Sequence, residues 1–292
     1  MSAPDIPVPP PVGGRKWSGD GPVKLSVLMA AYNEERTIAA AVDSVLSREY
    51  PCEMELIVVD DGSSDRTPLL LAQHAHPLVI THRHPRNLGK GAALLTAGKL
   101  ATGTHILPFD ADLEYSPDDI PRLVEPVIQG RCDVVYGARL FGQNTVYQSY
   151  RYALGNELMT LAANVLFDAH LADLHTCLKL IPLSLFRSLH LHARGFGLDT
   201  EITACLLRIG VRPFEVPVSY YSRSHAEGKK ISWHDAVDCF RIMGKVRCMR
   251  RERVGPSIPR ALPPRLPDFP AEPGLNGRRA VGRHDVRGPS PR

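Results

Sequence analysis

Three carboxylates, Asp110, Asp112 and Glu114, follow the short apolar run His105–Phe109 at alternate positions. If that run is a buried strand, its carboxyl end lies where an open α/β sheet presents its ligand-binding groups. Three converging carboxylates repel one another unless a cation joins them, and hard oxygen ligands suit Mg²⁺ or Mn²⁺. Such an ion keeps positions open for the phosphates of a nucleotide. An Asp-x-Asp pair is a weak signal alone, so the flanking sequence has to support it.

The elements around these acids alternate between strand and helix. This order predicts right-handed crossovers and an α/β fold with a parallel sheet. The loops that follow the strands, 32–34, 60–65, 87–91 and 110–114, should therefore line one edge of the sheet. Asn33 is a candidate N-cap for the first helix. The expected strands are Lys24–Ala31, Met54–Val59, Leu78–Thr81 and 105–109, and the expected helices end near 48, follow 67, and span 92–101 and 117–129.

The second half of the chain continues this alternation. Arg139 follows a fifth expected strand, 133–138, and Arg151 lies near the start of a long helix, 147–167. The polar turn Asp173–Cys177 precedes a short apolar strand. Further expected elements are a helix at 198–209, a strand at 211–219, a basic loop at 222–230 and a helix at 233–251.

The ends of the chain differ in composition from its centre. The first 22 residues hold six prolines and no apolar stretch typical of a signal peptide, so we expect a disordered leader. Residues 241–292 carry thirteen Lys and Arg against four Asp and Glu, although the net charge of all 292 residues is only +4. We predict one domain at 23–252, with a first half at 23–140 and a second half at 141–252, and a disordered basic tail at 253–292.

Composition also bears on location. No apolar run approaches the roughly 18 residues that a spanning helix needs, and the six cysteines are scattered without metal-binding spacing. We therefore expect reduced thiols, a cytoplasmic protein and no transmembrane helix. The basic tail suits anionic lipid or simple solvation, and nucleic acid is not an expected partner.

The chain contains neither a G-x-G-x-x-G fingerprint nor a Walker A motif, which argues against a dehydrogenase or a P-loop enzyme. It offers instead an acidic turn, 60–65, that can accept hydrogen bonds from a base or a ribose. The three acids after the fourth expected strand provide the metal-type group. Together they indicate a nucleoside diphosphate whose charge is neutralised by a cation.

At this point the sequence resembles a known family. The ordered segments 27–34, 58–65, 87–91 and 110–112 resemble those of family 2 inverting glycosyltransferases of the GT-A fold, a Rossmann-like mostly parallel sheet flanked by helices. The later segments 135–139, 173–177, 215–217 and 227–231 resemble the branch of dolichyl- and polyprenyl-phosphate hexose synthases. The resemblance covers roughly 24–250.

The resemblance implies a role for each matching residue. Tyr32, Glu34 and Asp61 would hold the base and ribose of the nucleotide-sugar donor, with Ala111 beside them in the substrate site. Asp110, Asp112 and Glu114 would bind Mg²⁺ or Mn²⁺, which bridges the diphosphate and acts as Lewis acid for the leaving nucleoside diphosphate. The residues that would grip the acceptor phosphate and the diphosphate are Arg139, Arg151, Arg223, Lys229 and Lys230. Asp110, Asp112, Arg139 and Arg223 are the predicted catalytic group.

The implied acceptor is a polyprenyl phosphate, of the dolichyl or undecaprenyl kind, and the donor is of the GDP-mannose or UDP-glucose type. A phosphate monoester is largely anionic near neutral pH, so it needs positioning rather than a general base. A hydroxyl acceptor would need a base, and Asp199, Glu201 and His175 are the candidates. Members of this branch often carry a carboxylate where His175 stands, and we expect His175 to be a hydrogen-bonded turn residue.

A lipid acceptor implies contact with a membrane. The helix expected at 233–251 combines an apolar stripe with basic flanks, which suits docking on the cytoplasmic leaflet. The same pattern suits a helix packed on the core with a solvated basic face, and the sequence leaves both open. It also leaves open a hydroxyl acceptor, a non-catalytic nucleotide-sugar-binding partner of a membrane complex, and a phosphatase of the haloacid dehalogenase type. The phosphatase is disfavoured because its Asp-x-Asp lies near the start of the domain, whereas Asp110 follows three expected strands.

Overall fold

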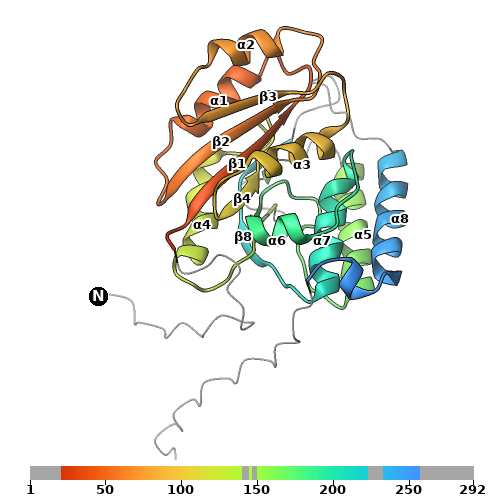
Figure 1. Cartoon of the computed structure of the whole chain (residues 1–292). Coiled ribbons are helices and arrows are strands. Elements are labelled where there is room, and N and C mark those ends of the chain that lie inside the picture. The colour runs from red at the N-terminus through yellow and green to blue at the C-terminus, as the bar shows by residue number, and fades with distance from the viewer. Residues whose placement is uncertain (1–20, 140–144, 147–149, 223–232, 257–292) are drawn as a thin grey trace, which may run out of the picture.

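The protein folds around one seven-stranded sheet flanked by helices on both faces (Figure 1). The computed structural model describes residues 21–139, 145–146, 150–222 and 233–256. The predicted leader and tail lie almost wholly outside these ranges. The strands are β1 (Lys24–Ala31), β2 (Glu53–Asp60), β3 (Val79–Arg83), β4 (His105–Pro108), β5 (Val135–Ala138), β7 (Lys179–Pro182) and β8 (Phe214–Pro217).

The strand order is β3-β2-β1-β4-β7-β5-β8. Pairing is parallel throughout except at β7, which runs antiparallel to both of its neighbours, β4 and β5. The prediction of a mostly parallel α/β sheet is thus confirmed. Because β7 is reversed, the start of β7 lies at the same edge as the carboxyl ends of the other strands. A separate two-stranded pair joins β6 (Thr145–Val146) to β9 (Tyr220–Tyr221).

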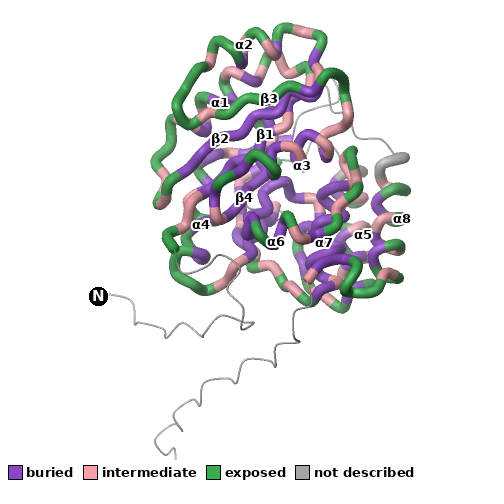
Figure 2. The backbone as a smooth tube through the Cα atoms, in the orientation of Figure 1, coloured by how far each residue is buried: buried purple, intermediate pink, exposed green. Residues whose placement is uncertain are grey.

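Two apolar cores lie on opposite faces of the sheet. One is formed with α1 (Ile38–Leu46), α2 (Thr67–Gln73) and α4 (Ile120–Ile128), and the 3-10 turn η1 (Pro117–Asp119) leads into α4. The other is formed with the remaining helices. Figure 2 shows the central strands buried and the edge strand β3 exposed. The helices on the second face are α3 (Lys90–Leu100), α5 (Tyr150–Phe167), α6 (Leu183–Ser188), α7 (Gly197–Ile209) and α8 (Trp233–Cys248), and η3 (Arg251–Arg253) follows α8.

The first helix begins later than predicted. It starts at Ile38 with Thr37 as N-cap, so the assignment of Asn33 as N-cap was wrong. Asn33 has a positive φ of 54°, and its side-chain oxygen accepts a hydrogen bond from the Ser64 amide. The residue therefore serves a tight turn that ties two loops together, a position that Asn tolerates well. In the part of the chain that the structure describes, no helix is both long and apolar enough to cross a bilayer.

Candidate active site

The loops after β1 and β2 meet at the carboxyl edge of the sheet, as the topology predicted. The Asn33 amide donates to Ser63 Oγ at 2.9 Å, and the Glu34 amide donates to Thr67 Oγ1 at 2.9 Å. Tyr32 and Glu34 are partly buried in this pair of loops. Their assignment to the base and ribose of a nucleotide stays a prediction, and the structure places both at the predicted edge.

Asp61, also predicted to contact the nucleotide, is only 2% exposed. Its Oδ1 accepts from the Leu88 amide at 3.0 Å, and its Oδ2 accepts from the Gly89 amide at 2.7 Å. His84 Nδ1 lies 2.7 Å from Oδ1. The carboxylate of Asp61 thus fixes the loop that follows β3, and nucleotide binding through this residue stays a prediction.

That loop presses against the second half of the chain. Gly89 has a φ of 101°, and a Cβ at this position would lie 2.3 Å from the Arg194 carbonyl oxygen. A Cβ on Gly91 would lie 2.6 Å from the Ala193 carbonyl oxygen. The Ala92 amide donates to the Arg194 carbonyl at 3.0 Å. Only glycine permits this approach of two backbones, and it fixes where the side chain of the intervening lysine begins.

The intervening residue, Lys90, is paired with Asp110. Its Nζ lies 2.7 Å from Asp110 Oδ1 and 2.9 Å from Oδ2, and each side chain is 21% exposed. Burial alone raises the pKa of Asp110, but the Lys90 ammonium, together with Cys177 and Arg139, outweighs it and the pKa lies below its ordinary value. Burial alone lowers the pKa of Lys90, but Asp110, together with Cys177 and Asp199, outweighs it and the pKa lies well above its ordinary value. Both groups are therefore charged at neutral pH.

Lys90 was not among the predicted site residues. The only sequence signal was its place in the Gly89-Lys90-Gly91 segment of a strand-end loop, and that signal does not show that the lysine reaches across to the acids after β4.

The three predicted metal ligands do not form one group. Glu114 is 8% exposed, and its Oε2 accepts a 2.5 Å hydrogen bond from the Tyr220 hydroxyl. The Glu114 amide donates to Asp112 Oδ1 at 3.1 Å. Leu113 has a φ of 62°, so the chain turns here and alternate side chains cease to share a side. Among the described residues no set of three His, Cys, Asp or Glu side chains is placed to hold a metal, so binding of an ion by all three carboxylates stays a prediction.

A smaller ligand set still suits a divalent ion. Asp110 and Asp112 follow β4 at the carboxyl edge, and both are partly exposed. Asp110 already accepts a cationic group, the Lys90 ammonium, on both of its oxygens. Mg²⁺ and ions like it commonly use one or two carboxylates and take their other ligands from water and substrate phosphates. The residues present therefore fit such an ion through Asp110 and Asp112, without Glu114.

Arg139 lies just after β5, as predicted, and is held by Asp173. Its Nε donates to Asp173 Oδ2 at 2.6 Å, and a second guanidinium nitrogen donates to Oδ1 at 2.8 Å. The Asp173 side chain is 1% exposed. Burial alone raises the pKa of Asp173, but Arg139 outweighs it and lowers the pKa from 3.8 to about 2. The Arg139 guanidinium also lies over the Tyr220 ring, 4.9 Å from its centroid. Arg139 is therefore a fixed cation, held in place by its paired carboxylate.

Four other predicted phosphate-binding residues cannot be placed. Arg223, Lys229 and Lys230 lie outside the described residues, and Arg151 belongs to α5 but its side chain is not described. Their roles stay predictions. Ala111 is buried beside the acids, 3% exposed.

The candidate general bases are all engaged. His175 Nδ1 lies 3.0 Å from Asn156 Oδ1 and its Nε2 lies 2.9 Å from Thr200 Oγ1, and burial lowers the pKa of His175 to about 4. Glu201 Oε2 accepts from the amides of residues 192 and 193 at 2.8 and 2.7 Å. Asp199 Oδ1 lies 3.3 Å from Lys179 Nζ, which is fully buried. The expectation that His175 is a hydrogen-bonded turn residue is confirmed.

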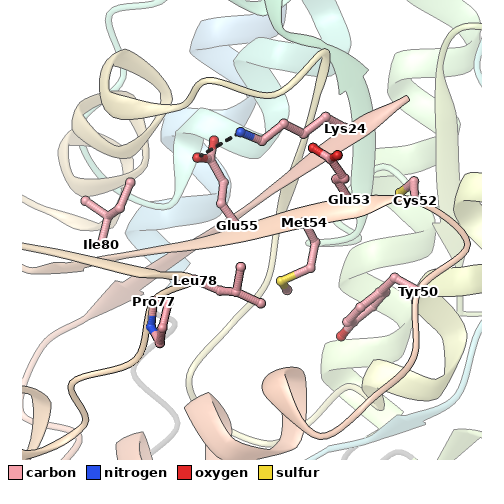
Figure 3. A pocket seen from close by; sticks show the side chains of 9 residues that line it. All are labelled: Lys24, Tyr50, Cys52, Glu53, Met54, Glu55, Pro77, Leu78 and Ile80. Atoms are coloured by element: carbon pink, nitrogen blue, oxygen red, sulfur yellow. Dashed lines mark ion pairs between the residues drawn. The ribbon is translucent and has the colours of Figure 1, made fainter. Parts of the chain in front are cut away.

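A hollow lies at the opposite edge of the sheet, where β1 and β2 begin (Figure 3). Glu55 lies there with Lys24, whose Nζ is 3.8 Å from Glu55 Oε2. Glu55 also accepts hydrogen bonds from Ser26 and Thr102, so its carboxylate is already stabilised by groups of the protein itself. The hollow has none of the acids that follow β4 and is not part of the candidate site. Its lining residues are Lys24, Tyr50, Cys52, Glu53, Met54, Glu55, Pro77, Leu78 and Ile80.

The sheet, its helices and the charged groups along its carboxyl edge define a GT-A type of α/β domain. Glucosyl-3-phosphoglycerate synthase from Mycobacterium tuberculosis, solved with Mn²⁺, UDP-glucose and phosphoglyceric acid, has the same fold: the TM-score is 0.59 at 20% identity, over 84% of this chain and 89% of that chain. The model of glycosyl transferase family 2 matches residues 26–189, more than half of the sequence. The chain belongs to this family.

Curated relatives are similar in sequence. The low-salt glycan biosynthesis hexosyltransferase Agl6 of Haloferax volcanii is 27% identical over 208 residues, which cover 68% of this chain and 48% of that protein. The undecaprenyl-phosphate 4-deoxy-4-formamido-L-arabinose transferase of Edwardsiella ictaluri is 32% identical over 217 residues, covering 70% of this chain and 62% of that protein. The chain thus spans about half to three-fifths of the length of these relatives.

Proposed function

We propose that this protein transfers a hexose from a nucleotide sugar to a polyprenyl phosphate, with inversion at the anomeric carbon. One relative supports the acceptor class, since it carries undecaprenyl phosphate in its name. A second relative, named as a hexosyltransferase, supports the transfer of a hexose. The observation that carries the proposal is the engagement of all three candidate bases, His175, Asp199 and Glu201. An acceptor that is already an anion needs none of them.

The reaction is a single displacement in this proposal. An acceptor phosphate oxygen forms a bond to the anomeric carbon, while the bond from that carbon to the donor phosphate breaks on the opposite face. The electron pair leaves with the nucleoside diphosphate, and no proton has to be moved. Asp110 and Asp112 would hold a divalent ion, which would supply Lewis-acid chemistry to that leaving group. The charged residues of this chain then have two tasks, which are to align the two phosphates and to balance their charge.

The two halves of the domain divide these tasks. Tyr32, Glu34 and Asp61 on the first half are proposed to hold the nucleoside. On the second half, Arg139 contributes a positive charge whose position Asp173 fixes. The rest of the phosphate grip is assigned to Arg151, Arg223, Lys229 and Lys230. A preorganised cation stabilises developing charge better than one that must first rearrange.

Access to a lipid acceptor is proposed through the outer faces of α5 and α8, which pack against each other (Figure 1). On α8, Met243 and Val246 are buried, whereas Val237 and Phe240 are 45% and 47% exposed. Part of the predicted apolar stripe of this helix therefore packs in the core, and the other part lies on the surface. α5 adds a larger apolar stripe on one helical face, formed by Leu154, Leu158, Leu161 and Val165, which are 37%, 53%, 58% and 74% exposed.

Charge favours an anionic bilayer as the occupant of this face. Arg241 and Lys245 are exposed on α8, and Arg247 donates from Nε to the Leu166 carbonyl of α5 at 2.8 Å. A symmetric contact between two copies pairs the same patch of each copy, so it would bring two basic surfaces together. Anionic lipid headgroups match both the apolar stripe and its basic border. We therefore place the protein at the membrane surface, on the cytoplasmic side.

One incubation tests the reaction. Labelled UDP- and GDP-hexoses are supplied with Mn²⁺ and, in parallel, a short-chain polyprenyl phosphate, 3-phosphoglycerate and neutral sugars. We expect lipid-extractable label only with the polyprenyl phosphate, and its loss in Asp112→Ala. Label on a hydroxyl compound would show that the acceptor is not a polyprenyl phosphate. Donor binding without transfer to any acceptor would indicate a non-catalytic protein.

A second experiment tests the docking face. The double variant Leu158→Asp with Val165→Asp should lose co-sedimentation with vesicles that contain phosphatidylglycerol, whereas Leu69→Asp should not. Leu69 is 56% exposed on α2, across the sheet from α5. Equal binding by all three proteins would refute the assignment of this face, and a loss of dimer with unchanged vesicle binding would assign it to a second copy.

A further inference from the structure

The ion pair between Lys90 and Asp110 is hard to explain by stability alone. Each side chain is only 21% exposed, and in a largely buried ion pair the cost of desolvation offsets much of the attraction between the charges. The pair also lies at the carboxyl edge of the sheet, where a carboxylate without a partner would be easily hydrated. Both Asp110 oxygens are nevertheless within hydrogen-bond distance of one ammonium.

The position of this ammonium is built into the fold. The backbone on each side of Lys90 is fixed by the close approach of Gly89 and Gly91 to residues 193–194. The Phe196 ring, from the segment that leads into α7, lies 5.8 Å from Lys90 Nζ. The backbone of Lys90 is thus held in place, while its ammonium group pairs with the carboxylate that an incoming divalent ion would use.

We propose that Lys90 is a tethered cation that holds the divalent ion's place at Asp110 while the donor is absent. The inference rests on the proposed metal-dependent donor site. A metal ion arriving alone must displace the ammonium from Asp110, the carboxylate that holds it at 2.7 Å. A metal ion arriving with a nucleoside diphosphate brings new anionic oxygens for the ammonium. The ion should therefore bind well only together with the nucleotide.

The size of the effect follows from charge. With Lys90 present, Asp110 and Asp112 together with the lysine carry a net charge of −1, and without it they carry −2. A unit positive charge within ~5 Å of a divalent ion at a partly exposed site changes its affinity by about tenfold or more. Removal of the lysine charge should thus strengthen binding of the metal alone and weaken binding of the metal with nucleotide. A merely structural lysine would not produce opposite changes.

The test measures free Mn²⁺ by electron paramagnetic resonance, with and without UDP or GDP, in the full chain. Lys90→Met should bind Mn²⁺ alone at least about tenfold more tightly than the unaltered protein, and added nucleotide should strengthen its Mn²⁺ binding less. Lys90→Arg keeps the charge and should behave like the unaltered protein. Lys99→Met makes the same change at the other end of α3, on an exposed residue, and should have no effect.

The outcomes separate the two proposals. If Lys90→Met binds Mn²⁺ alone no more tightly than the unaltered protein, the tethered-cation role is wrong. If the unaltered protein fails to bind Mn²⁺ even with nucleotide, the proposed donor site itself is wrong. A circular dichroism melt of each variant shows that the comparison is made on folded protein. Asp110→Asn combined with Lys90→Met should abolish the tighter binding of Mn²⁺ alone that Lys90→Met gives. Tighter binding that persists in the double variant would show that the ion binds elsewhere.

Discussion

The buried pair of Arg139 and Asp173 offers a sharp prediction. Asp173→Asn keeps the shape of the side chain and removes its charge, so one oxygen that now accepts from Arg139 becomes an amide that donates. The guanidinium, with its side chain 11% exposed, is left without the Asp173 anion. Loss of one partner of a buried pair costs about 3–5 kcal/mol of unfolding free energy.

The pKa of Asp173 gives an independent lower figure. Its fall from 3.8 to about 2 corresponds to about 2.5 kcal/mol in favour of the charged folded state. Because the pKa is lower in the folded state, this stabilisation is present above about pH 4 and is lost as the pH falls toward 2. Asp173→Asn should therefore lower the free energy of unfolding at neutral pH. It should also remove the part of the acid dependence of stability that comes from protonation of Asp173.

Urea unfolding at pH 7 and at a series of lower pH values measures both effects. Asp168→Asn is the matched control, because Asp168 is exposed and its positive φ of 50° suits Asn. The double variant Arg139→Met with Asp173→Asn should be more stable than Asp173→Asn alone, since no charge is left buried and unpaired. An Asp173→Asn protein within about 1 kcal/mol of the unaltered one, with the same acid dependence, would refute the reasoning.

Two further predictions concern other parts of the fold. Gly91→Ala should lower the midpoint of urea unfolding, because a Cβ would lie 2.6 Å from the Ala193 carbonyl oxygen. Gly155→Ala is the control: its Cβ would meet open space, so the free energy of unfolding should rise by about 0.5–1 kcal/mol. A stable Gly91→Ala would mean that the two backbones separate easily. The pKa of His175 is lowered to about 4 by burial, so its contribution to stability is present above about pH 6.5 and is lost as the pH falls toward 4. His175→Gln should flatten the stability profile across that range, and an unchanged profile would show that His175 is not the group that titrates.

The sequence predicted those parts of the fold that depend on local pattern. β1 spans 24–31 as expected, because a continuous apolar run bounded by polar residues has one favourable place in a parallel sheet. The convergence of the loops after β1, β2, β3 and β4 followed from the alternation of strand and helix. Arg139 was placed correctly just beyond β5 for the same reason.

Long-range pairing accounts for what the sequence did not reveal. Glu114 is separated by 106 residues from the Tyr220 hydroxyl that occupies its carboxylate. Lys90 and Asp110 are 20 residues apart and meet only because two loops share an edge. The turn at Leu113 was equally hidden, since a leucine with positive φ leaves no mark in composition. The chain therefore changes direction between Asp112 and Glu114, which the alternate spacing of the three acids did not predict.

The place of β7 in the sheet affects how the protein can be made and divided. This strand comes from the second half of the chain and lies between β4 and β5 of the first half. A fragment that ends after β5 would expose the edges of both strands, and such edges invite aggregation. The central sheet can close only after about 180 residues have been synthesised, so the nascent chain leaves these strand edges exposed until then. Two coexpressed fragments cut between β5 and α5 would regain a sheet only by assembling with each other, which makes this position suited to a split reporter.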